Sequence, residues 1–279
     1  MLSIVIPTFN NINYLKLCIN SIKKNSKYEH EIIIHVNEGS DGTLIYVKEK
    51  NLNYTFSENN IGLCSSINRA VTLSKKKYIL YSHDDMYFCP EWDIELNKEI
   101  NNIKHSNFYL SGTMIQKFNG HINFDCGDTY QNFDEIKLLK NYKNINCNDH
   151  QGSHFAPHVV SKDLWNKVNG FSEEYNPGIG SDPDFNMKLW KCGVRIFKGI
   201  NKFKVYHFAS ITTRKKKGFI QNKGEKTFLK KWGVTTKFFK KHYLKTNSEY
   251  NGPLNEPNKN IFYFFDLLLC KIKLLFTKK

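Results

Sequence analysis

Short apolar runs alternate with amphipathic stretches along the first 85 residues of the chain. Each run ends at polar or turn-forming residues, which is typical of a buried strand. The predicted strands cover residues 3–7, 31–36, 54–56 and 77–82. Residues 14–24 place Leu15, Ile19 and Ile22 on one helical face, and a second helix is predicted within 61–74. The alternation predicts an α/β fold whose mainly parallel sheet is flanked by helices.

The pattern is less regular after Pro90, and no internal repeat is present. Strands are predicted at 108–116, 194–197 and 203–207, with a strand and loop within 152–160. Helices are predicted at 134–144, 162–168 and 183–191. We therefore expect a mixed sheet that continues through the second half of the chain.

Three polar clusters each follow a predicted strand. They are Thr8-Phe9-Asn10, residues 38–41, and Asp84-Asp85. Ligands of parallel sheets gather beyond the carboxyl ends of the strands, so the three clusters are expected to converge. Asn37 and Asp41 have an alternative role, because such side chains often shape a turn by local hydrogen bonds.

Asp84 and Asp85 repel each other unless a cation or hydrogen-bond donors compensate their charges. Carboxylate oxygens suit Mg²⁺ or Mn²⁺, which commonly bind one or two carboxylates together with substrate phosphates. A solvated turn is the alternative for an isolated acid pair. The position of this pair after a buried strand favours the metal site.

The ordered motifs of residues 3–207 resemble those of the family 2 glycosyltransferases, the inverting group with the GT-A fold. The opening strand and loop at 3–10 are similar to the family's nucleotide-contacting segment, and 36–43 to its base-binding loop. Residues 59–63 and 66–70 are similar to its glycine-containing loop and helix, and 81–86 occupy the DxD position. Glu38 departs from the usual Asp, and its loop is one residue shorter than the common form.

The resemblance implies a role for individual residues of this chain. Its metal ion, Mn²⁺ or Mg²⁺, would be held by Asp85, with Asp84 and His207 as further ligands; a structural hydrogen bond is the alternative for His207. The residues that it places at the nucleotide-sugar are Pro7, Thr8, Phe9, Glu38, Gly62, Asn68 and Asp84.

A second acidic cluster, Ser181-Asp182-Pro183-Asp184, begins a predicted helix. Asp182 has the chemistry of an N-cap, and capping alone would explain it. By resemblance, Asp182 matches the family's general base and Asp184 is the fallback, although Ser181 replaces the usual Glu. A base that takes the acceptor proton and a cation that stabilises the departing diphosphate would together permit direct displacement at the sugar.

Other aromatic and histidine residues favour packing over chemistry. His154 and His158 would face an acceptor-side loop by analogy, but packing is the preferred interpretation for both. Trp165 and Trp190 lie at helical positions, where core burial is expected. Seven widely spaced cysteines show no metal-ligand spacing, which favours reduced thiols.

The chain has 279 residues and a formal charge of +15, which is unevenly distributed. Residues 198–279 hold 20 Lys and Arg against 4 Asp and Glu, a net charge of +16, whereas the first 197 residues are almost neutral. Such segregation indicates an acidic partner. The apolar stretch 261–276 is too short to span a bilayer and fits an interfacial helix; packing on the domain is the alternative. Residues 214–224 are a candidate lid.

We expect a GT-A domain at 1–209, with a nucleotide-sugar half at 1–112 and an acceptor half at 113–209, followed by a basic, partly amphipathic helical extension at 210–279. The expected function is sugar transfer from a nucleoside-diphosphate sugar to a glycan or lipid-linked acceptor. The expected location is cytoplasmic, peripheral on an anionic membrane surface. The alternative is a membrane- or nucleic-acid-binding protein whose fold binds sugar nucleotide without catalysis, although the basic segment carries no recognised nucleic-acid motif.

Overall fold

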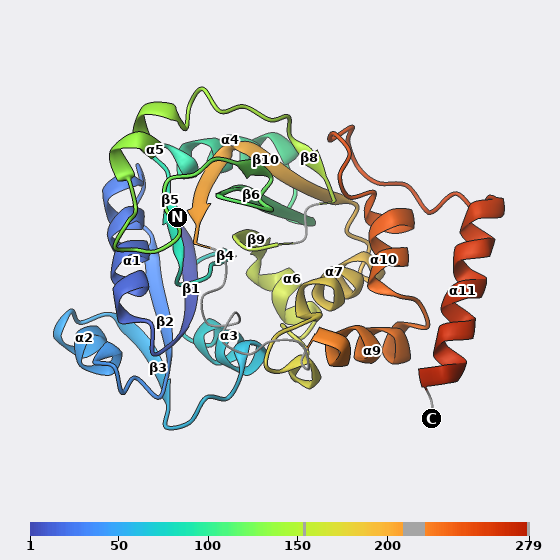
Figure 1. The fold of residues 1–279 in the computed structure, drawn as a ribbon, viewed down its shortest axis with the longest axis horizontal. Helices are drawn as coiled ribbons and strands as arrows, with labels where there is room; N and C mark the ends of the chain where they lie inside the picture. The colour runs from blue at the N-terminus through green and yellow to red at the C-terminus, as the bar shows by residue number, and fades with distance from the viewer. Residues whose placement is uncertain (153–154, 209–220, 278–279) are drawn as a thin grey trace.

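A ten-stranded mixed sheet runs through the protein, with helices on both faces (Figure 1). The computed structural model describes residues 1–152, 155–208 and 221–277. Its strands are β1 (Leu2–Phe9), β2 (Glu31–Asn37), β3 (Asn53–Ser57), β4 (Tyr78–Tyr81), β5 (Met86–Phe88), β6 (Phe108–Gln116), β7 (Ile122–Asn123), β8 (His150–Gln151), β9 (His158–Ser161) and β10 (Ile196–His207). Their order is β3-β2-β1-β4-β9-β6-β10-β5, with β7 beside β6 and β8 beside β10.

The helices of the body form two layers. On one face lie α1 (Ile12–Asn25) and α4 (Trp92–Ile103), and on the other lie α3 (Leu63–Val71), α6 (Lys162–Lys167) and α7 (Ser181–Lys191) (Figure 1). The body also contains α2 (Thr43–Glu49), α5 (Glu135–Asn141) and the 3₁₀ turn η1 (Glu173–Tyr175). This arrangement confirms the predicted α/β fold.

The first half of the sheet agrees closely with the hydrophobic pattern. Strand β1 pairs in parallel with β2 and β4, and β2 pairs in parallel with β3. Isoleucines of β1 and β2 are buried on both faces of the sheet, as parallel strands require. The carboxyl ends of these strands therefore meet at one edge, where the predicted polar clusters follow them.

The second half differs from the predicted elements in two places. The strands predicted at 194–197 and 203–207 are one strand, β10, whose register against β6 shifts between Ile200 and Lys204. The polar residues Asn201 and Lys202 interrupt the apolar pattern, but the strand continues across this irregularity. Helix α4 was not predicted, although Trp92, Leu96 and Ile100 recur at helical spacing and are buried.

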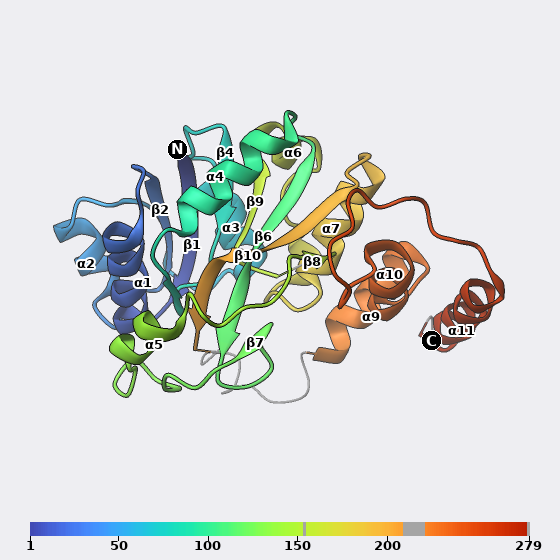
Figure 2. The ribbon, with the colours of Figure 1, turned by 90° about the horizontal axis from the view of Figure 1, so that it is seen from above.

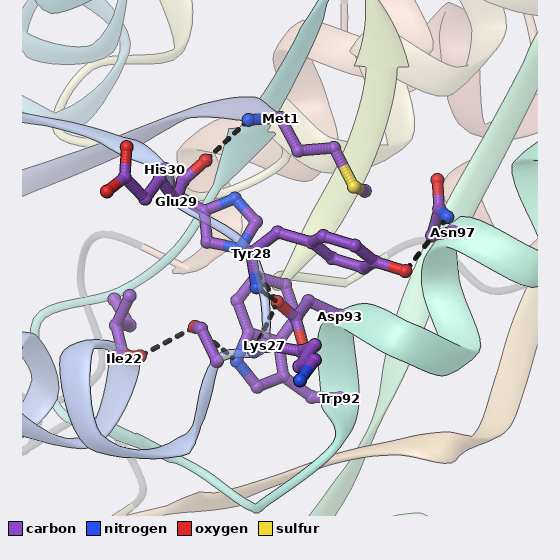
Figure 3. Close-up of polar contacts among 10 residues, drawn as sticks. Met1, Ile22, Lys27, Tyr28, Glu29, His30, Trp92, Asp93 and Asn97 are labelled. Atoms are coloured by element: carbon purple, nitrogen blue, oxygen red, sulfur yellow. Dashed lines mark hydrogen bonds and ion pairs between the residues drawn. The ribbon is translucent and has the colours of Figure 1, made fainter.

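Asp93 fastens α4 to the turn between α1 and β2 (Figure 3). Its fully buried carboxylate accepts hydrogen bonds from the backbone N–H groups of Lys27 and Tyr28 and contacts Nε2 of His30 at 3.0 Å. The neighbouring Trp92 donates from Nε1 to Ser26 Oγ at 3.1 Å. These contacts hold the start of α4 against the turn that follows α1.

The C-terminal part is helical and lies beyond α7 (Figure 2). It contains α9 (Gln221–Trp232), α10 (Thr236–Phe239), the π-helical turn η2 (Lys240–Leu244) and α11 (Ile261–Thr277). Phe228, Phe239 and Leu244 belong to the main core, whereas α11 packs in a separate small cluster. The domain boundary at residue 209 remains a prediction. In the part of the chain that is described, every helix falls short of the length and apolarity needed to cross a membrane.

Candidate active site

The three polar clusters meet at the carboxyl ends of β1, β2 and β4, as predicted. Thr8, the next-to-last residue of β1, donates a hydrogen bond from Oγ1 to Asp84 Oδ2 at 2.6 Å. Asn10 donates from Nδ2 to Glu38 Oε2 at 3.1 Å, which joins the loops that follow β1 and β2. These contacts confirm that the clusters converge, because they link residues 76 and 28 positions apart.

Asn37 and Asp41 shape these loops. The Asn37 side chain is buried and bonds to Thr8 O and to the hydroxyl of Ser66. Asp41 accepts from the backbone N–H of Ile12 at 2.8 Å and from that of Thr43 at 3.0 Å. The structural interpretation of both residues is thus confirmed, and their side chains order the loops around the site.

His83, Asp85 and His207 form a compact group of possible metal ligands. Nε2 of His207 lies 3.1 Å from Asp85 Oδ1 and 3.4 Å from Nδ1 of His83, and the third separation, His83 Nδ1 to Asp85 Oδ1, is 3.9 Å. A point equidistant from the three atoms is about 2 Å from each, which matches the roughly 2.0–2.2 Å ligand distances of small divalent ions. The donor set therefore fits a divalent metal ion.

Strand pairing assembles this group. The end of β10 runs antiparallel to β5, and His207 stands opposite Met86, the residue after Asp85. The backbone N–H of Phe208 also donates to Asp85 O at 3.1 Å. On the other side of the His207 ring, the Gln116 amide contacts Nδ1 at 2.5 Å and fixes the orientation of the imidazole.

Burial shifts the pKa values of His83 and Asp84. It lowers the pKa of His83 to about 4, and Asp85 opposes this shift while His207 adds to it. His83 is therefore neutral at pH 7 and can ligate a metal ion. Burial, and then repulsion from Asp85, raises the pKa of Asp84, against the hydrogen bond from Thr8. A bound cation would relieve that repulsion.

Asp182 lies in the first turn of α7 but does not cap the helix. The predicted N-cap position is wrong, because α7 begins at Ser181 and its N-cap is Gly180. The buried Oδ1 of Asp182 has no hydrogen-bond partner among the described residues. Burial raises its pKa to about 7, and the charge of Lys240 opposes the shift. A carboxylate with a free oxygen and a pKa near neutrality is suited to accept a proton.

Asp184 has a different environment. Its fully buried carboxylate accepts hydrogen bonds from Ser172 Oγ at 2.6 Å and Trp232 Nε1 at 2.8 Å, and Nζ of Lys231 lies 2.9 Å away. These partners come from the loop before η1 and from α9. Asp184 therefore joins the body to the C-terminal helices.

The loop that precedes Asp182 packs against the start of α3. Leu63 donates its backbone N–H to Pro177 O at 3.2 Å, and Cys64 donates to Asn176 Oδ1 at 3.0 Å. Burial and then the charge of Asp182 raise the pKa of Tyr81, to which Asp85 and Asp84 also contribute. Both acidic clusters thus act electrostatically on the same phenol, which ends β4.

The other expected nucleotide-sugar residues lie around these loops. Pro7 is buried in β1 and Phe9 is half-buried at its end. Gly62 adopts φ 83° against Asn176, where any Cβ would collide with that side chain, so only glycine fits. Asn68 points to the backbone of Phe171, which occupies both ends of its amide. Whether these residues contact donor remains a prediction.

Packing accounts for the remaining aromatic candidates. His158 is buried between Tyr109 and Phe185, and Trp165 and Trp190 are core residues, as expected. His154 and most of the candidate lid at 214–224 lie outside the described residues. His83 is the metal-ligand candidate that sequence reasoning missed, although it directly precedes the acid pair.

The sheet, the converging loops and the acid-lined edge define the class of nucleotide-sugar transferases with the GT-A fold, and comparisons with known proteins give the family. The family described as "Glycosyl transferase family 2" matches residues 3–158. The chain belongs to this family.

Two curated relatives that match part of the chain are both named uncharacterized glycosyltransferases. An uncharacterized glycosyltransferase of Rickettsia prowazekii is 32% identical over 101 residues, which are 35% of this chain and 31% of that protein. Another from Rickettsia bellii is 28% identical over 121 residues, 41% of this chain and 17% of the relative. The matched region thus spans less than a third of either relative.

Solved structures show the same fold at low sequence identity. Residues 1–349 of TarS from S. aureus match with a TM-score of 0.55 and 19% identity over 74% of this chain and 60% of that one. GalNAc-T7, solved with UDP, GalNAc and Mn²⁺, matches with a TM-score of 0.57 and 16% identity, covering 74% and 43% of the two chains. TarS has also been solved with UDP-GlcNAc.

Proposed function

We propose that the protein is an inverting glycosyltransferase that moves a hexosyl or N-acetylhexosaminyl group from a UDP-sugar to a hydroxyl group of a glycan or lipid-linked acceptor. The observation that carries this proposal is the combination of a cation-sized group of ligand atoms at His83, Asp85 and His207 with a buried carboxylate oxygen of Asp182 that has no partner among the described residues. The UDP and UDP-sugar complexes of the structural neighbours support the choice of donor.

On the donor side, Thr8 and Glu38 would contact the nucleoside, and Asp84 the ribose. His83, Asp85 and His207 would hold the metal ion, with Gln116 keeping the His207 ring in place. When bound, the ion would neutralise charge on the departing diphosphate. Two imidazoles and one carboxylate suit Mn²⁺ better than Mg²⁺, which prefers oxygen ligands and retained water.

On the acceptor side, Asp182 would be the general base. Its raised pKa lets it take the proton of the acceptor hydroxyl as the oxygen attacks C1 of the sugar. The bond from C1 to the diphosphate oxygen breaks in the same step, and the proton remains on Asp182. One displacement inverts the anomeric configuration without a covalent enzyme intermediate.

We also propose that the protein works peripherally at the cytoplasmic face of a membrane, where a lipid-linked acceptor would be accessible. The support is the charge distribution, with a net charge of +16 from residue 198 onward. Lys and Arg near an anionic lipid surface contribute about 1 kcal/mol each.

A donor screen tests the proposed transfer. The purified protein is incubated with UDP-glucose, UDP-galactose, UDP-GlcNAc, UDP-GalNAc and, as a different base, GDP-mannose, with Mn²⁺ or with EDTA. We expect one UDP-sugar to raise the melting temperature and to release UDP slowly, in Mn²⁺ only. If none of the UDP-sugars stabilises the protein in Mn²⁺, the proposed donor is wrong.

A further inference from the structure

The outer face of α11 holds nine of the 17 exposed large hydrophobic side chains among the described residues. Both views place this helix at the edge of the molecule, beyond α9 and α10 and far from α2 (Figures 1 and 2). Nine of its apolar side chains are each at least 41% exposed: Ile261, Phe262, Phe264, Phe265, Leu268, Leu269, Ile272, Leu275 and Phe276. Large exposed apolar patches mark interaction sites.

The opposite side of α11 holds the helix on the protein. Tyr263 and Cys270 are buried, with Leu267 and Leu274 beside them, against Phe238 of α10 and Leu229 of α9. Asp266 adds polar contacts at 2.7 Å to Lys241 and His242 of η2. The docked stripe keeps α11 in a fixed orientation, so its apolar face is presented outward by the fold.

Helical geometry shows that the outward face is continuous. At about 100° per residue, the nine exposed apolar side chains span an arc of about 160° that contains no polar residue. Lys271 and Lys273 lie just beyond the two borders of this arc, one on each side, and both are exposed. Lysines at these positions can extend their ammonium groups to phosphates while their stems follow the apolar surface.

Length and charge decide between the possible partners. Seventeen residues make a helix of about 25 Å, shorter than the roughly 30 Å hydrocarbon core, so α11 fits a position parallel to the bilayer surface. A second copy of the chain would bring another net charge of +15 to the same surface. Anionic lipid supplies both the apolar phase and the opposite charge.

We propose that α11 is a membrane-docking helix that lies in the interface of an anionic bilayer, with the face centred on Phe265, Leu268 and Ile272 among the acyl chains and Lys271 and Lys273 at the headgroups. This inference does not depend on sugar transfer, because it rests on the exposed face of α11 alone. The two interpretations of this segment, an interfacial helix and a helix packed on the domain, are compatible, because one side of α11 packs on the protein and the other faces outward.

Vesicle flotation of the full chain tests the proposal. The vesicles are phosphatidylcholine alone, or phosphatidylcholine with 30% phosphatidylglycerol (about one anionic lipid in three, in the range that attracts basic segments). The test variant is Phe265→Gln with Ile272→Gln, and the matched control is Ile45→Gln with Ile136→Gln, two exposed apolar residues of α2 and α5. All four positions are solvent-exposed, and circular dichroism melts confirm folding.

We expect the wild type and the control to float with anionic vesicles, and the α11 variant to need roughly tenfold more lipid or more. Lys271→Glu with Lys273→Glu should weaken binding to anionic vesicles selectively. Equal flotation of the α11 variant and the wild type would overturn the proposal. So would a wild-type dimer that ignores vesicles and becomes monomeric in the α11 variant, because a second copy would then be the partner.

Discussion

Two pairs of acids, Asp84 with Asp85 and Asp182 with Asp184, each contain two carboxylates with different surroundings. In each pair one carboxylate accepts hydrogen bonds from identified side chains, and the other has the surroundings of a candidate metal ligand or base. Thr8 holds Asp84, while Ser172 and Trp232 hold Asp184. Asp85 instead joins two imidazoles, and Asp182 keeps a buried oxygen without a partner among the described residues.

The comparison shows that similar acid pairs acquire different chemistry from their surroundings. Two imidazoles around a carboxylate make a candidate site for a cation. Burial of the Asp182 carboxylate instead raises its pKa to about 7, against the charge of Lys240, so that it can accept a proton near pH 7. Substitutions that remove charge while keeping shape can therefore separate the four roles.

The largest effect is expected for Asp85→Asn. This change removes the only carboxylate of the metal group, and we expect transfer to fall at least about 10³-fold, together with the loss of Mn²⁺ binding measured by calorimetry. Asp84→Asn is the comparison within the pair and should retain Mn²⁺ binding while weakening binding of the nucleotide. Unaltered Mn²⁺ affinity in Asp85→Asn would show that the ion binds elsewhere.

Asp182→Asn is expected to lower kcat about 10³-fold, since a general base contributes 10²–10⁴. Binding of the UDP-sugar, measured by calorimetry, should stay within about twofold, because the residue acts on the acceptor. Asp163→Asn is the matched control, an exposed acid in the first turn of the neighbouring α6. If Asp182→Asn retains wild-type kcat, another group is the base.

Asp184→Asn is expected to act on stability. The charge that it removes is fully buried and neutralises Lys231, which is also paired with Glu174. Because Lys231 is 28% exposed, we expect a moderate loss of about 2–3 kcal/mol in the free energy of unfolding, measured in urea. Near-normal kcat of the folded protein would accompany this loss. Normal stability with abolished kcat would instead assign the base to Asp184.

His83→Gln tests the residue that completes the metal group. A ligand lost from three should weaken Mn²⁺ affinity, and we expect a change of about 10- to 100-fold in the metal concentration that gives half-maximal transfer. Saturating Mn²⁺ should then restore most of the rate. The exposed His105→Gln is the control. Unchanged Mn²⁺ dependence would leave Asp85 and His207 as the only protein ligands in this group.

The sequence predicted the convergence of the loops that follow β1, β2 and β4 well because topology imposes it. Parallel strands with buried isoleucines end at one edge of a sheet, so Thr8, Glu38 and Asp84 had to come together once the strands were recognised. The loop roles of Asn37 and Asp41 were also open to prediction, since their residue types favour local hydrogen bonds.

The remaining features depend on contacts across long stretches of chain. His83 becomes a candidate ligand only because β10 brings His207 beside it, 124 residues later. Resemblance favoured Asp182 over Asp184 as the base, but the different environment of Asp184 depends on a hydrogen bond from Trp232, 48 residues farther along the chain. The local hydrophobic pattern carries no information on such long-range pairings. The spacing of Trp92, Leu96 and Ile100, in contrast, is a local pattern that indicates α4.

The smallest expected effect is the pH dependence that follows from Asp182. Its pKa of about 7 means that kcat should rise about tenfold per unit below pH 7 and level off above it.

The folded state holds this proton more tightly than the unfolded chain, whose pKa is about 3.9, so the stabilisation present at low pH is lost as the pH rises through 7. Asp182→Asn, which cannot ionise, should therefore gain on the wild type by about 2–3 kcal/mol between pH 5 and pH 8, and the two should be equally stable only below about pH 4. Urea unfolding at both pH values in EDTA measures this difference without a contribution from metal. A variant that is no more stable than the wild type at pH 8 would mean that Asp182 ionises freely, which would weaken the electrostatic contrast between the two acid pairs.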